Sequence, residues 1–267
     1  MPEGNETHRW AELHDGMFKG KRVKVDSPQG RFLDAGLIDG RVLVGVRAVG
    51  KHLGYDFGKI EGKRRVLHVH MGLYGKFAEG EQPMPEPRGA LRLRMWDKTL
   101  WLELRGPTDC SVWTEAQWEK LLARLGPDPL NRDSPAKMIE RIGKRKTQIG
   151  VLLMDQSIIS GLGNIYRAEL LFRARVSPFR AGAAVPAEVL GTIWKDACAL
   201  MPDAMIDRRI VTTRPKDRPH KRGRALREET HYVYRRQGRP CFLCGTKVET
   251  KVMVGRNLFW CPGCQAE

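Results

Sequence analysis

The sequence predicts an α+β protein of several domains, because three stretches of the chain follow three different patterns. Residues 21–104 hold short runs such as RVLVGVRAV and ALRLRMW, whose β-branched and alternating apolar residues are typical of strands. After residue 113 the apolar residues recur at helical spacing, and residues 241–267 carry two Cys-x-x-Cys pairs. We therefore expect a β-sandwich or flattened barrel, a helical domain and a small cysteine-bearing module.

The first predicted domain, residues 1–113, begins with a helix and continues as strands. Residues 5–15, NETHRWAELHD, place Trp10 and Leu13 at helical spacing, and Gly16 offers a stop. The polar stretch EGEQPMPEPRG, residues 79–89, predicts a loop inside this domain because strand-like runs resume directly after it.

The second predicted domain, residues 114–207, is helical. Its helices are expected over the runs EAQWEKLLARLG, PAKMIERIG, TQIGVLLMDQ, LGNIYRAELLFRA and VPAEVLGTIWKDACALM. Residues 208–240 follow with twelve Lys/Arg and three Asp/Glu, a net charge of +9, and with little hydrophobic periodicity. This segment is predicted to be a basic loop or linker.

The overall charge points to a polyanionic partner. The 267 residues contain 47 Lys and Arg against 31 Asp and Glu, a formal net charge of +16, which favours nucleic acid. A membrane surface is the competing partner, but the chain has no apolar run of about 18 residues and no signal-peptide pattern. We expect a soluble, intracellular protein.

The C-terminal cysteines have the spacing of a metal site. Cys241, Cys244, Cys261 and Cys264 form two pairs separated by sixteen residues, so four thiolates can surround one zinc ion tetrahedrally, with the spacer as a β-hairpin. Four protein ligands leave no open position for water, which favours structural Zn²⁺. The alternative is two reactive or merely buried cysteine pairs. Arg256 falls near the expected hairpin turn, where it either clamps phosphates or is a solvated charge.

A second candidate for anion binding lies in the helical domain. Gly161 and Gly163 precede Asn164, which begins an amphipathic run. Glycines allow close backbone approach, Asn can cap a helix, and N–H groups at a helix start bind phosphate oxygens. The alternative is an ordinary turn between two helices.

The opening residues, Met-Pro-Glu-Gly, have two readings. Pro2 suits the first turn of a helix, and Glu3 and Glu6 suit the positive end of its dipole. The other reading is chemical: removal of Met1, which a small second residue favours, leaves the secondary amine of Pro2 as the N-terminus.

Motifs spread over nearly the whole chain resemble the formamidopyrimidine-DNA glycosylase and endonuclease VIII family. They are PEG at 2–4, GKHL at 50–53, HMGLYG at 70–75, LGP at 125–127, GLGNIYRAE at 161–169 and the two cysteine pairs. The resemblance implies an N-terminal β-sandwich, a helix-two-turn-helix domain and a zinc finger that together grip duplex DNA. It also implies a bifunctional DNA glycosylase/AP lyase that removes oxidised bases in base excision repair. We expect the protein to be a monomer and to be cytoplasmic, or nucleoid-associated if bacterial.

The resemblance assigns the chemistry to three residues. Pro2 would attack the sugar C1′ and form a Schiff base, Glu3 would protonate the opening deoxyribose ring, and Lys51 would hold a phosphate beside the lesion. An α-amine with a pKa of about 8 is substantially deprotonated near neutral pH, whereas a lysine near 10.4 is not, so a terminal amine suits this role. The alternative for Lys51 is a surface lysine.

The resemblance assigns DNA contacts to four further residues. Asn164 would contact the backbone, and Arg256 would clamp phosphates around the flipped nucleotide. Leu73 and Tyr74 would fill the space that the extruded base leaves. The alternative for these two is a hydrophobic turn packed in the sandwich.

The resemblance is closer to the endonuclease VIII branch, which favours oxidised pyrimidines such as thymine glycol and dihydrouracil. PEG at the start, LYG in the void-filling turn and the lack of an RRFG-like loop near residue 105 carry this expectation. Specificity for oxidised purines such as 8-oxoguanine or formamidopyrimidine is the alternative. A damaged-DNA binding protein without activity is a second, because charge and phosphate sites would look the same. A transcription-type zinc ribbon would leave the first 205 residues unexplained.

Overall fold

The computed structural model describes residues 2–266, which divide into two compact units at Arg124. Unit 1 ends at Arg124 and unit 2 begins at Leu125. Met1 and Glu267 lie outside the described residues, and so does the expected removal of Met1. Among the described residues, no helix is long and apolar enough to cross a membrane.

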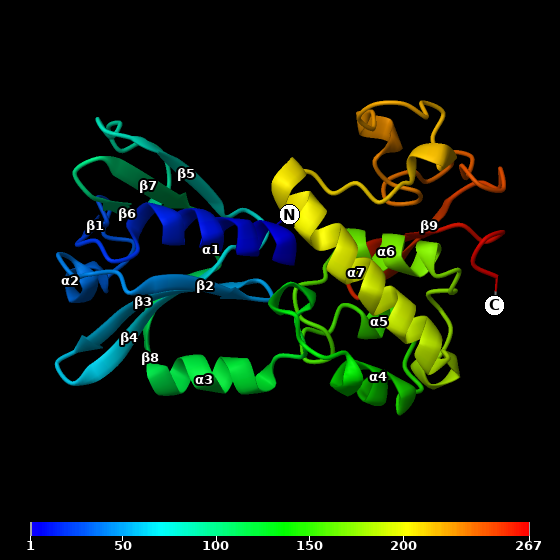
Figure 1. The fold of residues 1–267 in the computed structure, drawn as a ribbon, viewed down its shortest axis with the longest axis horizontal. Helices are drawn as coiled ribbons and strands as arrows, with labels where there is room; N and C mark the ends of the chain where they lie inside the picture. Colours follow the sequence, from blue (N-terminus) through cyan, green and yellow to red (C-terminus); the bar gives the residue numbers. More distant parts are fainter. Residues whose placement is uncertain (1, 267) are drawn as a thin grey trace. The chain divides into compact units, whose positions relative to one another are not determined.

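Unit 1 contains the predicted β-sandwich. The described part of its chain forms the helices α1 (Gly4–Phe18), α2 (Ala35–Ile38) and α3 (Glu115–Arg124) and the strands β1 (Lys24–Asp26), β2 (Gly45–Val49), β3 (His52–Ile60), β4 (Lys63–His70), β5 (Lys76–Glu81), β6 (Leu91–Trp96), β7 (Leu100–Arg105) and β8 (Asp109–Thr114). The strands make two four-stranded antiparallel sheets, in the orders β1-β6-β7-β5 and β2-β3-β4-β8. Figure 1 shows α1 running between these sheets.

The core of unit 1 follows from the alternation of side chains along the strands. Leu67 and Val69 of β4 are buried in the cluster that also holds Leu53 and Tyr55 of β3. His68 and His70, which alternate with these apolar residues, therefore point to the opposite face of the same sheet. Residues of α1 such as Phe18 complete the apolar cluster, which fixes this helix to both sheets.

The helix α3 belongs to unit 1, although the sequence predicts it as part of the second domain. We expected the domain boundary at residues 113/114, but α3 contacts β4 and β8, and the compact units divide after it. The reason is Trp118, which is fully buried against the sheet. A Cβ at Gly54 would lie 2.7 Å from the Trp118 ring, so the glycine makes room for the indole.

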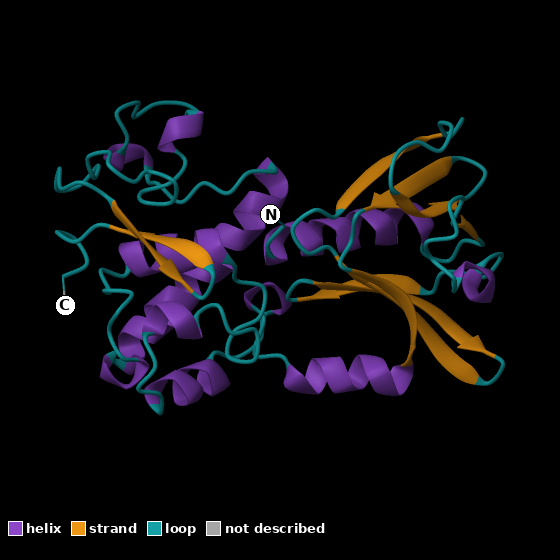
Figure 2. Ribbon diagram, turned by 180° about the vertical axis from the view of Figure 1, so that it is seen from behind, coloured by secondary structure: helices purple, strands orange, loops and turns teal. Residues whose placement is uncertain are grey.

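Unit 2 is mainly helical, as predicted. Its described helices are α4 (Ala136–Gly143), α5 (Ile149–Leu152), α6 (Asn164–Arg173) and α7 (Ala187–Asp207), with short 3₁₀ turns at Pro129–Asn131 and Gly182–Ala184. The run TQIGVLLMDQ forms only the single turn α5 rather than a longer helix. Side chains from all four helices share one apolar core. Figure 2 shows the strands β9 (Glu249–Met253) and β10 (Arg256–Trp260) as a hairpin beside these helices.

The basic segment 208–240 has little regular structure beyond the 3₁₀ turns Pro215–Asp217 and Arg227–Glu229. It is anchored on Glu169 of α6, whose side chain is fully buried. The Glu169 carboxylate accepts hydrogen bonds from the backbone N–H groups of Tyr232, Val233 and Tyr234 at 2.8–2.9 Å and from the hydroxyl of Thr212. A buried carboxylate needs such a complete set of donors, so both ends of the segment are tied to one helix.

Candidate active site and nucleic-acid interface

Glu3 stands at the N-cap of α1, and Pro2 directly precedes it. The backbone of Glu3 is extended, with φ −109° and ψ −177°, and its carbonyl accepts hydrogen bonds from the N–H groups of Glu6 and Thr7 at 3.1 and 3.2 Å. Glu3 is 1% exposed, whereas Pro2 is half-buried. The helix-start reading of these residues and the chemical reading are therefore compatible, because the helix presents the N-terminal segment in a defined direction.

Two contacts fix α1 on the sheet that carries Lys51. Nδ1 of the buried His14 lies 2.7 Å from the Tyr55 hydroxyl, and Oδ1 of Asp15 accepts a 2.7 Å hydrogen bond from the N–H of Val46. Burial lowers the pKa of His14 and raises the pKa of Tyr55 well above its usual value. This pair of polar contacts sets the register between α1 and the β2–β3 hairpin.

Lys51 lies in the two-residue turn between β2 and β3. Val49 pairs with His52 across the ladder, which leaves Gly50 and Lys51 as the turn. Gly50 has φ +59°, the region that glycine tolerates at the first position of such a turn. Lys51 is half-buried.

Leu73 and Tyr74 project from a tightly built turn between β4 and β5. A Cβ at Gly75 would lie 2.4 Å from the Met71 carbonyl oxygen, and one at Gly72 would clash with Thr108. Leu73 and Tyr74 are nevertheless 53% and 79% exposed. They are not packed in the sandwich, which removes the alternative interpretation of this turn.

Strand register brings these two turns to the same end of unit 1. His52, next to Lys51, pairs with His70, which precedes the turn that carries Leu73 and Tyr74. In Figure 1 the start of α1 also lies toward this end of the unit. The structure therefore brings the Lys51 turn and the Leu73-Tyr74 turn to one end of the sandwich, and α1 begins toward the same end.

A histidine cluster that the sequence pattern did not reveal lies beside this end. His52 Nδ1 lies 2.9 Å from His68 Nε2, and His68 Nδ1 lies 2.6 Å from Oδ2 of Asp109. Burial lowers the pKa of His52 to about 3 and also lowers the pKa values of His68 and His70. The alternating histidines of VLHVHM were the available signal, but a strand with a polar outer face gives the same pattern.

In unit 2, Asn164 is bound to other protein groups and does not cap its helix. Gly163 is the N-cap of α6, and Asn164 Nδ2 donates a 2.9 Å hydrogen bond to the carbonyl of Asn257 in β10. Oδ1 of Asn164 accepts from the buried guanidinium of Arg167, which also reaches the Met253 carbonyl at 3.4 Å. The sequence did not single out Arg167, which joins α6 to the β9–β10 hairpin.

Arg256 opens the second strand of that hairpin. The turn before it consists of Val254 and Gly255, with φ +53° and +65°, and Arg256 pairs with Met253. Arg256 is half-buried, while Val252 and Val254 are 68% and 59% exposed. Arg256 therefore lies directly after a tight turn, and its expected position near the hairpin turn is confirmed.

The four predicted metal ligands come together. The Sγ atoms of Cys241, Cys244, Cys261 and Cys264 all lie within 4.8 Å of one another. Four thiolates at about 2.3 Å from a central zinc would be about 3.8 Å apart in a tetrahedron. The Cys241–Cys264 and Cys244–Cys261 pairs are 3.8 and 3.4 Å apart, so the cluster fits a zinc ion.

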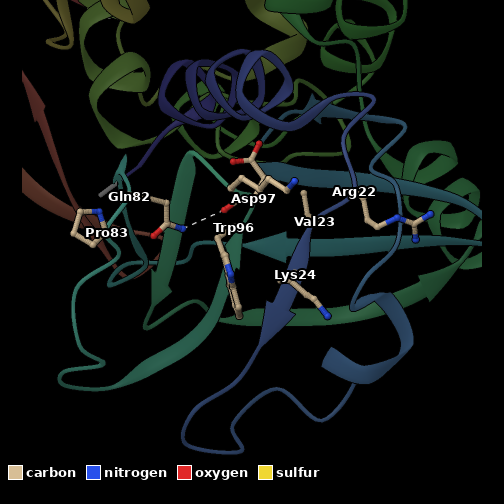
Figure 3. Close-up of a pocket in the computed structure, with 8 residues that line it drawn as sticks. Arg22, Val23, Lys24, Gln82, Pro83, Trp96 and Asp97 are labelled. Atoms are coloured by element: carbon tan, nitrogen blue, oxygen red, sulfur yellow. Dashed lines mark hydrogen bonds between the residues drawn. The ribbon is translucent and has the colours of Figure 1, made fainter.

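Unit 1 also contains a pocket (Figure 3). Its volume is about 730 Å³, and it is lined by Arg22, Val23, Lys24, Gln82, Pro83, Trp96, Asp97 and Lys98. None of the predicted site residues lines it. Gln82 donates to the Asp97 carbonyl at 3.2 Å, so this amide joins the two walls of the pocket.

Comparison with known proteins identifies the relatives of this chain. Residues 125–215 match the formamidopyrimidine-DNA glycosylase H2TH domain. A protein of Mycobacterium tuberculosis named Endonuclease 8 1 is 44% identical over 272 residues, covering 99% of this chain and 100% of the relative. The chain belongs to the formamidopyrimidine-DNA glycosylase and endonuclease VIII family. It is thus a DNA glycosylase of DNA repair, and the predicted family and fold class are confirmed.

More distant relatives agree with this assignment. A formamidopyrimidine-DNA glycosylase of Thermus thermophilus is 31% identical over 254 residues, covering 92% of this chain and 91% of the relative. Wild-type Lactococcus lactis Fpg (MutM), solved with DNA containing N7-benzyl-Fapy-dG, has a TM-score of 0.81 at 20% identity over the full length of both chains. Lactococcus lactis Fpg bound to DNA with an abasic site has a TM-score of 0.78 at 19% identity, covering 99% of this chain and 100% of that chain. These structures show the shared fold.

Proposed function

We propose that this family member removes oxidised pyrimidines from duplex DNA and cleaves the strand at the resulting abasic site. The observation that carries the proposal is the Pro2-Glu3 pair at the start of α1, in the same unit as the Lys51 turn. The relationship to a protein named Endonuclease 8 1 supports the pyrimidine preference over the oxidised-purine alternative.

The chemistry starts at the nitrogen of Pro2, once Met1 has been removed. Its lone pair forms a bond to C1′ of the damaged nucleotide, and the glycosidic bond breaks with its electron pair leaving on the base. The proton that the nitrogen carried is lost and neutralises the departing base. Glu3 gives a proton to the ring oxygen as the sugar opens, which leaves a positively charged iminium between Pro2 and C1′. The iminium withdraws electrons, so loss of the proton at C2′ expels the 3′ phosphate, and a second elimination expels the 5′ phosphate.

Other residues of unit 1 would hold the DNA in the reactive position. Lys51 would neutralise a phosphate beside the lesion, because its ammonium group is a compact positive charge on a flexible stem. The exposed side chains of Leu73 and Tyr74 would enter the stack in place of the extruded base.

Unit 2 would bind the phosphate backbone of the DNA. The second N–H of the Asn164 side-chain amide and the guanidinium of Arg256 are the proposed donors. One structural Zn²⁺ held by Cys241, Cys244, Cys261 and Cys264 would keep the Arg256 turn folded, with no part in the reaction itself. We further propose that the protein acts as a monomer in the cytoplasm.

Borohydride trapping tests the reaction. Protein that begins at Pro2 is mixed with duplexes containing thymine glycol, 8-oxoguanine or an abasic site, and borohydride reduces any iminium to a stable covalent adduct. We expect a trapped band that forms faster with thymine glycol than with 8-oxoguanine. Pro2→Gly and a form that retains Met1 are the controls, and both should strongly reduce the band.

The same experiment decides between the alternatives. Faster trapping on 8-oxoguanine would favour an oxidised-purine glycosylase. Tight binding to the abasic duplex without any trapped band would identify a protein that binds damaged DNA without cleaving it.

A further inference from the structure

The outer face of the β2-β3-β4-β8 sheet carries a layer of polar aromatic rings beneath α3. His52 and Asp109 both pair with His70 across the sheet, and His68 lies two residues earlier on the same face. The His68 ring stacks on Trp113 with 3.8 Å between ring centroids, and His52 and His70 are 4.8 Å apart by the same measure. The layer therefore extends from β8 to the residue that follows Lys51.

The hydrogen bonds in this layer form a chain with a defined direction. The carboxylate of Asp109 accepts from Nδ1–H of His68, so Nε2 of a neutral His68 has no proton and accepts from Nδ1–H of His52. The tautomers of both rings follow from the carboxylate at the end of the chain. His52 is thus held in a single orientation by a group on the far strand of the sheet.

The surroundings keep these rings neutral. Burial is the largest cause of the lowered pKa values of His52, His68 and His70, and Lys51 lowers those of His52 and His70 further. The charged and titratable groups that act on His52 are His68 and His70 of β4, Lys51 and Arg124 at the end of α3. Asp109 of β8 acts on His68 and His70 and favours their protonation.

We propose that Asp109, His68 and His52 form a positioning relay that fixes the turn carrying Lys51. His68 and Asp109 are then positioning residues for the elimination chemistry, acting through Lys51 rather than on the DNA. This inference rests on the proposed function, because it assigns Lys51 a part in the reaction.

The polar layer has a physical advantage over an apolar one at this place. A fully satisfied hydrogen-bonded network specifies one geometry, whereas apolar side chains of similar volume allow several packings. The Val49–His52 pair closes the β2–β3 ladder at the base of the Gly50-Lys51 turn. A direct hydrogen bond to the residue after Lys51 restricts the turn at its base.

The test compares relay variants in single-turnover trapping on an abasic duplex. His68→Phe keeps a ring on Trp113 but removes both hydrogen bonds, and we expect the trapping rate to fall about tenfold to a hundredfold. His68→Gln keeps one donor and one acceptor and should recover most of the rate. Asp109→Asn should lower the rate about tenfold and carries the test if His68→Phe fails to fold.

Asp26→Asn is the matched control. Asp26 is 36% exposed beside Arg94 in the other sheet, and Asp109 is 38% exposed beside His68, so both variants remove a similarly exposed carboxylate. Trapping by Asp26→Asn should equal that of the unchanged protein, and melting temperatures of all variants report any general loss of stability.

A double-mutant cycle with Lys51→Ala separates positioning from a general structural effect. If the relay acts through Lys51, His68→Phe should change the trapping rate less than about twofold in the Lys51→Ala background. Equal fold-losses in both backgrounds, or an unchanged rate for His68→Phe alone, would overturn the relay. No trapped band with the unchanged protein would instead overturn the proposed function, and the relay with it.

Discussion

The two units hold their candidate functional residues by different means. In unit 1 the Lys51 turn and the Leu73-Tyr74 turn are placed by strand register, tight glycine contacts and a layer of neutral histidines. In unit 2 the buried Arg167 joins the start of α6 to the β9–β10 hairpin, and four clustered cysteines flank the two strands of that hairpin.

The difference teaches which condition each unit depends on. Neutral imidazoles can be buried with few partners, but they stay neutral only while the pH is above their pKa values. Thiolates gathered within 4.8 Å repel one another and need a cation between them. We therefore expect the site of unit 1 to be sensitive to acid and that of unit 2 to depend on metal.

Loss of a zinc ligand should have the largest effect and should separate the units. Cys261→Ser removes one thiolate of the predicted tetrahedron, and zinc binding stabilises small fingers by about 10 kcal/mol or more. We expect zinc content to fall from one ion per chain toward none and β9–β10 amides to lose protection in hydrogen exchange. The amides of α1 and β3 should keep theirs.

Cys198→Ser is the control for this experiment, because Cys198 lies on α7 outside the cluster. Retained protection in β9–β10 after chelation of the metal would show that the hairpin folds without zinc, and the contrast between the units would disappear.

Glu3→Gln should impair the chemistry without weakening the grip on DNA. A general acid typically contributes 10²–10⁴-fold, so we expect base excision in single turnovers to slow by about that factor while the Kd for an abasic duplex stays within about twofold. Glu12→Gln, an exposed position on the same helix, is the matched control. Parallel losses of excision and affinity would mean that Glu3 serves binding or folding instead.

Arg256→Ala should show the opposite separation. Hydrogen bonds to charged groups contribute about 1.5–3 kcal/mol, so affinity for duplex DNA should fall at least about tenfold. The slope of log K against the logarithm of the salt concentration should become less steep by the amount that about one phosphate contact contributes. Zinc content should not change. Arg256→Lys keeps the charge without the planar fork and should recover only part of the affinity; full recovery would argue against a bidentate clamp.

Much of the fold could be predicted from local pattern. The alternation in residues such as Leu67 and Val69 predicts strands, helical spacing predicts α4, α6 and α7, and the cysteine spacing predicts a cluster that the structure brings together. Each of these signals is contained within a short stretch of sequence.

What could not be predicted depends on contacts between distant segments. The sequence VLHVHM indicates a strand with one polar face, and it does not reveal that α3 covers that face through Trp118 and Gly54. The partner of His68 lies 41 residues away in β8, and that of Asn164 lies 93 residues away in β10. The histidine relay and the Arg167 link were therefore visible only in the structure.

Acid should lower the stability of unit 1 through its histidines. We expect this effect to be smaller than those of the substitutions above, and it tests the same difference between the two units. The pKa values of His14, His52, His68 and His70 are lowered by burial, that of His52 to about 3, so the folded state binds fewer protons than the unfolded state below pH 6.5. This stabilisation is complete above about pH 6.5 and is lost as the pH falls toward the lowered pKa values. Each such histidine adds a slope of up to about 1.4 kcal/mol per pH unit.

Hydrogen exchange between pH 6.5 and 5 measures this slope in each unit, above the range in which ordinary carboxylates titrate. In unit 2 burial lowers the pKa of His231, whereas in unit 1 it lowers the pKa values of four histidines. We therefore expect the stability of unit 2 to depend less steeply on pH. His52→Asn removes one of the four groups in unit 1 and should flatten the slope for β3 and β4 by about one histidine's share. An equal slope with and without His52 would mean that its ring protonates in the folded state, and the relay would then carry a charge beside Lys51.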